Sequence, residues 1–549
     1  MRTLDGTGLA KRGAGGPLGG ARRGSRAAAL LGITLLCCLC CLFGLAATAS
    51  AAPSGAAAPD FSAQARQARA ALAQAELTAS NASQMSVFGW AVAVDGDTAL
   101  VGAPGTGESI GVVYVFARVA GLWAQQQQLT AADAVTGTNF GSSVALVGDM
   151  ALMGAVGDSG FGQEIPGAAY IFIRYGGLWT QRQKLSAADG ATGDRFGATV
   201  ALVGDKALVG APYHAVGGRP SQGAAYVFVA ARPVWVQEAE LTAVDGVAND
   251  LFGCSVALSS NTALFFDTAL VGARSHSVGG LPRAGAAYVF TRSPFTTPAW
   301  TVQVRLSATA GAAYDEFGAS VALDGDTALI GAPYRDLAGS GGTDAGAAYI
   351  FMRSGAYWAQ QARLTPAEAT AGLGKARFGS SGAVSGDTVL VGAPGYFHKH
   401  RIEAGGAWAF TRSGGVWTQQ QKMNGGSLAR PREKFGASVA LSGDTVLVGA
   451  PKHYLPAIEA RAGAAFVFLT APTIKSFKPA SGPVGAGVAI TGSFLTGATA
   501  VAFNGTPTTF IAFGIAITAT VPSGATTGPI TVTTPLGVAT SATDFTVKR

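Results

Sequence analysis

Three histidines recur at one position of an internal repeat in this 549-residue chain. His214, His276 and His453 each lie four residues after the first glycine of a Gly-Ala-Pro motif or its equivalent, and Arg335 holds this position in another repeat. An imidazole can bind a metal ion, and it changes charge near pH 6. The spacing therefore indicates either a metal site or a contact whose affinity follows histidine protonation.

Aromatic and basic residues surround these histidines in the same segments. Exposed aromatic side chains next to arginine are the types that dominate binding hot spots, so we expect these segments to bind a ligand. A solvated surface of mixed charge is the alternative interpretation. The candidate ligand-binding residues are Tyr213, His214, Arg274, His276, Tyr334, Arg335, His398, His400, Lys452, His453 and Tyr454.

Other patterns that could support chemistry have simpler explanations. The histidines lie in different repeats, too far apart to share a zinc ion, so we expect no metal site and no cofactor. Gly107 to Gly111 fits the G-x-S-x-G pattern, but a nucleophile elbow needs a strand that turns into a helix, and this segment lies between expected strands. Cys254 replaces an alanine of other repeats, Ala198 and Ala319, which favours a small buried filler. We expect no catalytic residue.

A secreted hydrolase of polysaccharides is the main catalytic alternative. Such an enzyme needs two carboxylates about 5 to 10 Å apart in a cleft. The candidate carboxylates in the segments between repeats are Asp189, Asp194, Asp245, Asp250, Asp315 and Glu316. A purely structural component of the cell envelope is the third possibility.

The elements that must position these residues repeat seven times. Each repeat has a Phe-Gly pair, a Gly-Asp pair between apolar runs, a Gly-Ala-Pro motif, a Gly-Ala-Ala-Tyr-Val-Phe-like run and a tryptophan strand. Gly-Asp between apolar runs predicts a tight hairpin, and four antiparallel strands per repeat predict an all-β, seven-bladed β-propeller. The Phe-Gly pairs begin at Phe88, Phe140, Phe196, Phe252, Phe317, Phe378 and Phe435.

Two repeats depart from the pattern. The seventh has no tryptophan strand after Phe468, whereas residues 73–79 near the N-terminus match residues 236–243 around Glu-Leu-Thr-Ala. We expect this N-terminal strand to complete the last blade and close the ring. The fourth repeat carries a duplicated hexamer between Val256 and Ala273, which predicts a lengthened hairpin.

The two ends of the chain have a different composition. Residues 27–47 form an uncharged apolar run after a basic cluster, so residues 1–51 are expected to be a signal peptide or an N-terminal membrane anchor. Residues 52–72 form a linker and residues 73–471 the propeller. Residues 472–549 are rich in Thr, Val and Pro, which predicts a small β-sandwich. We expect a protein that is secreted or held at the cell surface.

Charge and cysteine content narrow the partners further. Six basic residues and one aspartate before residue 52 carry +5 of the net charge of +7, which leaves too little positive charge elsewhere for nucleic-acid binding. Cys254 is the only cysteine outside the apolar run, so the fold forms without an intramolecular disulfide. The expected partner is a protein or glycan at the cell surface, and the expected state is a monomer.

Phe196-Gly197, Gly210-Ala211-Pro212 and the following Gly-Ala-Ala-Tyr-Val-Phe run resemble the FG-GAP repeat of integrin α-chain propellers and of bacterial surface proteins. The resemblance implies extracellular binding or adhesion, often with Ca²⁺ in a carboxylate-rich hairpin. Here only Gly-Asp joins the strands, so the chain looks like the calcium-free bacterial variant. Pro472 to Val484, Ile490 to Gly492 and Val501 to Phe503 resemble an IPT/TIG immunoglobulin-like domain.

Overall fold

The computed structural model describes most of the chain from Gln74 onwards. The described residues are 74–157, 165–231, 233–261, 266–292, 300–337, 343–367, 374–397, 403–413, 415–425, 430–443, 445–469, 472–493, 495, 498–513, 516–534 and 537–548. The expected signal or anchor and the linker lie outside these residues. No helix in the described part is long and apolar enough to span a membrane.

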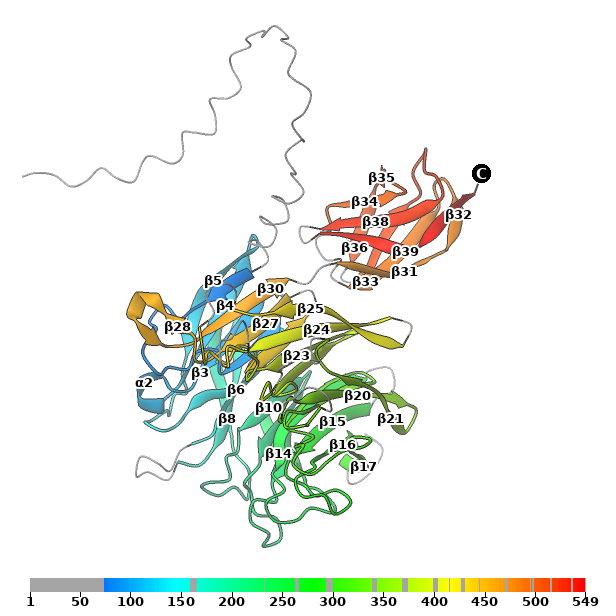
Figure 1. The fold of residues 1–549 in the computed structure, drawn as a ribbon. Coiled ribbons are helices and arrows are strands. Elements are labelled where there is room, and N and C mark those ends of the chain that lie inside the picture. Colours follow the sequence, from blue (N-terminus) through cyan, green and yellow to red (C-terminus); the bar gives the residue numbers. More distant parts are fainter. Residues whose placement is uncertain are drawn as a thin grey trace, which may run out of the picture. The chain divides into compact units, whose positions relative to one another are not determined.

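Seven antiparallel sheets of four strands succeed one another along the described chain (Figure 1). Blades 1 to 3 comprise β2 (Ala91–Asp95), β3 (Thr98–Ala103), β4 (Val112–Val119), β5 (Leu122–Leu129); β6 (Phe140–Val147), β7 (Met150–Ala155), β8 (Ala168–Tyr175), β9 (Leu178–Leu185); and β10 (Thr199–Val203), β11 (Lys206–Ala211), β12 (Ala224–Ala231), β13 (Val234–Leu241). Blades 4 to 6 comprise β14 (Phe252–Asn261), β15 (Phe266–Ala273), β16 (Ala286–Arg292), β17 (Trp300–Leu306); β18 (Ser320–Asp324), β19 (Thr327–Ala332), β20 (Ala347–Ser354), β21 (Tyr357–Leu364); and β22 (Ser381–Ser385), β23 (Thr388–Ala393), β24 (Gly406–Ser413), β25 (Val416–Met423).

Blade 7 takes its outer strand from the start of the described chain. Its order is β26 (Ser438–Ser442), β27 (Thr445–Ala450), β30 (Ala464–Leu469) and β1 (Gln74–Leu77), with Gln74 opposite Phe468 and Leu77 opposite Ala465. The predicted closure by residues 73–79 is therefore confirmed for the described strand. Each blade's first strand contacts the first strands of both neighbours, and β26 contacts β2, so the seven blades form a closed ring.

The Phe-Gly pair explains how neighbouring blades approach each other. Phe196 is buried and packs against Tyr226 and Phe228 on the third strand of its blade, with ring centroids 5.6 and 6.0 Å apart. Gly197 has φ +89°, and a Cβ atom there would collide with the carbonyl oxygen of Ala168 in blade 2. Only glycine allows this close backbone contact between blades without strain.

The Gly-Asp hairpins also connect blades. In blade 5, the Arg353 guanidinium binds Asp326 of the hairpin at 2.6 Å, lies over the ring of Trp358, and donates to Thr268 Oγ1 of blade 4 at 3.1 Å. Arg174 makes the equivalent contact with Thr98. The aspartate of the turn therefore holds an arginine that reaches the preceding blade.

The fourth blade has the expected longer hairpin. Strands β14 and β15 stay paired as far as Asn261 and Phe266, whereas β10 and β11 end at Val203 and Lys206. The tip of the hairpin, residues 262–265, lies outside the described residues.

Short elements and a second group of sheets complete the described fold. The segments between strands contain α2 (Thr106–Ser109), β28 (Tyr454–Leu455), η2 (Pro456–Ile458) and β29 (Ala460–Arg461). The C-terminal residues form two sheets around one core, as predicted for a β-sandwich. Their strands are β31 (Thr473–Lys478), β33 (Gly487–Ser493), β37 (Ala516–Thr520) and β36 (Phe510–Phe513), then β32 (Ser481–Pro483), β39 (Gly537–Lys548), β38 (Gly528–Thr534), β34 (Ala500–Phe503) and β35 (Thr506–Thr508).

Candidate functional site

Two sets of connections share one face of the ring. Because the strands of a blade are antiparallel, the connection from the second to the third strand emerges on the same side as the connection to the next blade. Contacts between the two sets confirm this, since His214 of the β11–β12 connection binds Asp194 of the β9–β10 connection. We call the side formed by these connections the loop face.

A hollow of about 590 Å³ opens on the loop face, next to the start of the first strands of several blades. Its lining follows the repeat, because it comes from residues beside the Phe-Gly pairs and from the ends of the Gly-Ala-Pro motifs. We call it the central hollow, and the residues used below are Met85, Trp90, Arg195, Tyr213, Cys254 and Arg274.

The central hollow combines exposed apolar and cationic groups. Trp90 is 51% exposed and Met85 is 72% exposed. Arg195 lies over the ring of Tyr213, with its guanidinium carbon 4.7 Å from the ring centroid. No Asp or Glu lines the hollow in the described part of the chain. The arrangement favours an anionic or π-rich ligand group.

Two of the sequence-predicted residues, Tyr213 and Arg274, lie in this lining. Cys254 also lines the hollow, and it is half-buried where the sequence predicted a small buried filler. Burial raises the pKa of its thiol. The sequence did not single out Trp90 or Arg195, although each lies next to a Phe-Gly pair.

The three described histidines lie inside the loop face, which corrects the expectation that they form part of its surface. His214, His276 and His453 are between 4% and 7% exposed. The Nδ1 atoms of His214 and His276 lie 2.7 and 2.8 Å from buried carboxylates of Asp194 and Asp250. These histidines bind the connection that precedes their own blade, so their Nδ1 atoms support the loops.

In blades 5 and 7, the residue at the same position of the repeat is also basic and lies next to a carboxylate. Arg335 binds Asp315 at 2.7 Å, and His453 Nδ1 lies 3.1 Å from Glu433. In blade 6, where Tyr396 replaces the base, the carboxylate is replaced by the buried Ala376. The pairing of base with carboxylate shows that this position serves the fold of the loop.

Each loop that carries these carboxylates has a left-handed backbone on both sides of the buried residue, and only in blade 3 is one of these flanking residues a glycine, Gly193. In blade 4, Asn249 and Leu251 have φ of +68° and +58° on either side of Asp250, whose side chain accepts the Val247 N–H at 2.7 Å. Left-handed non-glycine residues cost roughly 1–2 kcal/mol each. The contact with His276 fixes the Asp250 side chain, whereas the left-handed flanks also occur around Ala376 of blade 6, which has no such contact.

The remaining predicted residues stand apart from the central hollow. Tyr334 lies under the Arg377 guanidinium at 5.1 Å, and Tyr454 lies under that of Arg430 at 3.9 Å. Lys452 is exposed beside the buried His453. His398 and His400 lie outside the described residues.

Five of the six candidate hydrolytic carboxylates form hydrogen bonds or ion pairs with basic side chains, and Asp189 is considered below. Asp194, Asp250 and Asp315 bind the bases described above, and Glu316 binds Arg283. Asp245 binds Arg305 and the Tyr288 hydroxyl. These contacts assign the five residues a structural role.

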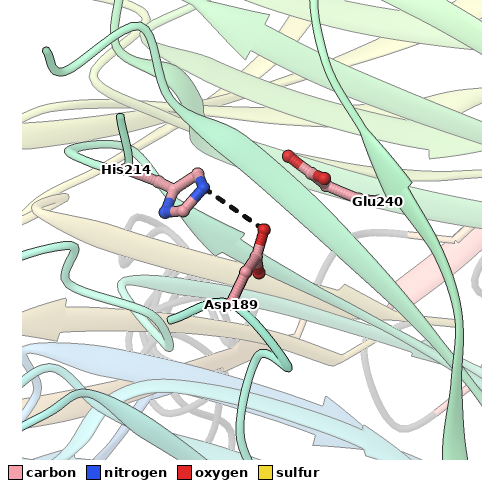
Figure 2. A group of neighbouring side chains, drawn as sticks. All are labelled: Asp189, His214 and Glu240. Atoms are coloured by element: carbon pink, nitrogen blue, oxygen red, sulfur yellow. Dashed lines mark ion pairs between the residues drawn. The ribbon is translucent and has the colours of Figure 1, made fainter. Parts of the chain in front are cut away.

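The two-residue Gly-Asp turns do not fit Ca²⁺. This ion takes six to eight oxygen ligands, whereas each turn offers one aspartate, and that aspartate already binds an arginine of its own blade in blades 1, 2, 5 and 6. One group of a different kind could hold a metal ion. Asp189, His214 and Glu240 each place one ligand atom within 4.8 Å of the others (Figure 2).

Comparisons with known proteins agree with the repeat pattern. A family model described as FG-GAP repeat matches residues 72–116, 123–172, 179–228, 235–290, 300–351, 358–410 and 417–468. Each match begins within two residues of the start of the outer strand of one blade and ends in the third strand of the next, so the first match includes β1 of blade 7. The matches stop before the C-terminal sandwich, whose IPT/TIG resemblance stays a prediction. A search of curated proteins gave no match.

Proposed function

The chain belongs to the FG-GAP repeat family, and from that premise we propose that it is an exported, non-catalytic binding module. It works outside the cell or at the cell surface, and it recognises a protein or glycan through the loop face. Propellers of this family often serve binding or adhesion, and the loops here stand on a rigid ring.

The central hollow is the observation that carries this proposal. It is concave and combines Trp90, Tyr213, Arg195 and Arg274 with an absence of acidic lining among the described residues. Aromatic and arginine side chains supply most of the binding energy at protein interfaces, and guanidinium groups form bidentate contacts with carboxylate or sulfate. The ligand group that fits is therefore an anion carried by a protein or a polysaccharide.

A binding experiment on purified protein tests this proposal. Arrays of acidic and neutral glycans, and of acidic and neutral peptides, would be probed with the wild type and with Trp90→Ala and Arg195→Ala. Each substitution should weaken binding of an acidic ligand at least about 10-fold, because each removes about 1.4 kcal/mol or more of hot-spot energy.

Tyr357→Ala is the matched control. Tyr357 is 82% exposed and starts the outer strand after the β20–β21 turn, on the side of the ring opposite the loop face. This variant should bind like the wild type. Loss of binding in Tyr357→Ala with full binding in Trp90→Ala would show that the binding site lies opposite the loop face, which contradicts the proposal. Binding to no probe would favour a purely structural component.

A further inference from the structure

Blade 3 brings one histidine and two carboxylates together from three separate segments. Asp189 comes from the β9–β10 connection, His214 from the β11–β12 connection, and Glu240 from the outer strand β13 (Figure 2). His214 Nε2 lies 3.5 Å from Asp189 Oδ2. Zn²⁺ bonds of about 2.0–2.2 Å place tetrahedral ligand atoms roughly 3.3–3.6 Å apart, so the pair already has a suitable spacing.

The histidine is held in the orientation that a metal ligand needs. Its Nδ1 atom donates to Asp194 Oδ2 at 2.7 Å, and this carboxylate also accepts the Ala191 N–H. With the proton on Nδ1, the lone pair of Nε2 points towards Asp189. A buried carboxylate on the second ring nitrogen is the usual support of a metal-binding histidine.

Neighbouring blades show what this arrangement looks like when a side chain supplies the cation. The strand position opposite the third-strand tyrosine holds Glu240 in blade 3, Arg305 in blade 4 and Lys184 in blade 2. Arg305 binds Asp245 and lies 3.4 Å from His276 Nε2. Lys184 binds the equivalent Asp133 at 2.6 Å. Blade 3 has a second carboxylate where these blades have a cation.

The second carboxylate also coincides with a different environment for the buried tyrosine of this blade. The hydroxyls of Tyr170 and Tyr288 donate to Asp133 and Asp245, at 2.9 and 2.6 Å. The buried hydroxyl of the equivalent Tyr226 faces Asp189 but makes no hydrogen bond of normal geometry to it among the described residues.

We propose that Asp189, His214 and Glu240 bind a divalent transition-metal ion of the Zn²⁺ class. Imidazole favours Zn²⁺ over Ca²⁺ and Mg²⁺, and three protein ligands leave one position open to solvent beside the exposed carboxylates. The inference does not depend on the proposed function. The segment 189–195 also supplies Thr192, Gly193 and Arg195 to the central hollow, so a bound ion would fix one of its walls.

Calorimetric titration of the full-length, metal-free protein with ZnCl₂ tests the proposal. The thiols are alkylated first, because Cys37, Cys38, Cys40 and Cys41 would also bind zinc. Glu240→Gln and Glu240→Arg should each remove one equivalent of bound Zn²⁺, with an affinity loss of at least about 100-fold. The arginine variant copies blade 4, where the same fold tolerates this side chain.

Arg305→Glu is the matched gain-of-function variant. It gives blade 4 the same three ligands, with Asp245, His276 and the buried support Asp250 already in place. The folded variant should bind one equivalent more than the wild type. Unchanged binding in both Glu240 variants, a wild type that binds no Zn²⁺, or an Arg305→Glu protein that gains none would each overturn the proposal.

Discussion

The bases of the loop face act at the residue scale as buried partners of strained loops. His453 is an example in which the two ring nitrogens join two different segments, since Nδ1 lies near Glu433 and Nε2 lies 3.2 Å from Glu76 of β1. Burial lowers the pKa of His453, but the two carboxylates outweigh this effect and raise it to about 9. The hypothesis that protonation near pH 6 switches this histidine is therefore wrong.

Stability should depend on pH through His453. A pKa raised from 6.5 to about 9 means that the folded state binds the proton more tightly. The contribution is fully present below about pH 6.5 and is lost as pH rises through 9. Urea unfolding of wild type and His453→Gln should differ by up to about 3 kcal/mol near pH 6 and by much less at pH 10. A difference that does not change between these pH values would contradict the role of the ion pair.

At the scale of the element, each blade depends on glycines with different structural roles. Gly197 of the Phe-Gly pair has φ +89° and faces the backbone of blade 2, whereas Gly204 of the Gly-Asp turn has φ +55° and open space around it. The sequence repeats both glycines equally, so spacing alone does not distinguish them. The distinction comes from the neighbouring blade, where Ala168 and Ala155 face Gly197 although they lie far from it in the sequence.

Replacing each glycine by alanine should distinguish the two roles, because the two variants should lose different amounts of unfolding free energy. Gly204→Ala should lower the free energy of unfolding by about 1–2 kcal/mol, the cost of a left-handed backbone. Gly197→Ala adds a collision with Ala168 of the preceding blade and should cost about 3 kcal/mol or more. Chemical denaturation of both variants measures this order. Equal losses would show that the blades do not meet at Gly197.

At the scale of the whole molecule, the sequence predicted the ring well because the fold repeats its signals. Phe-Gly, Gly-Asp and the match of residues 73–79 to residues 236–243 were enough for seven blades and their closure. The candidate sites were harder to predict. From the sequence, histidines of different blades were compared with one another, whereas the structure pairs each of the three described histidines with carboxylates around its own blade.

Part of the pairing between bases and carboxylates is visible in the sequence when two positions of each repeat are compared. The residue two positions before each Phe-Gly pair is acidic where the loop position holds His or Arg, as in Asp194 with His214, and Ala376 accompanies Tyr396. The meeting of Asp189 with Glu240 had no such signal, because only strand register and loop conformation bring these residues together.

Hydrogen exchange of the full-length protein, followed by mass spectrometry, tests the closed ring most directly. Residues 74–77 should exchange as slowly as Val234–Leu241, the outer strand of blade 3, because β1 pairs with β30 in the same way that β13 pairs with β12. Exchange of residues 74–77 at the rate of an unstructured peptide, with Val234–Leu241 protected, would contradict a ring that closes through its N-terminal strand.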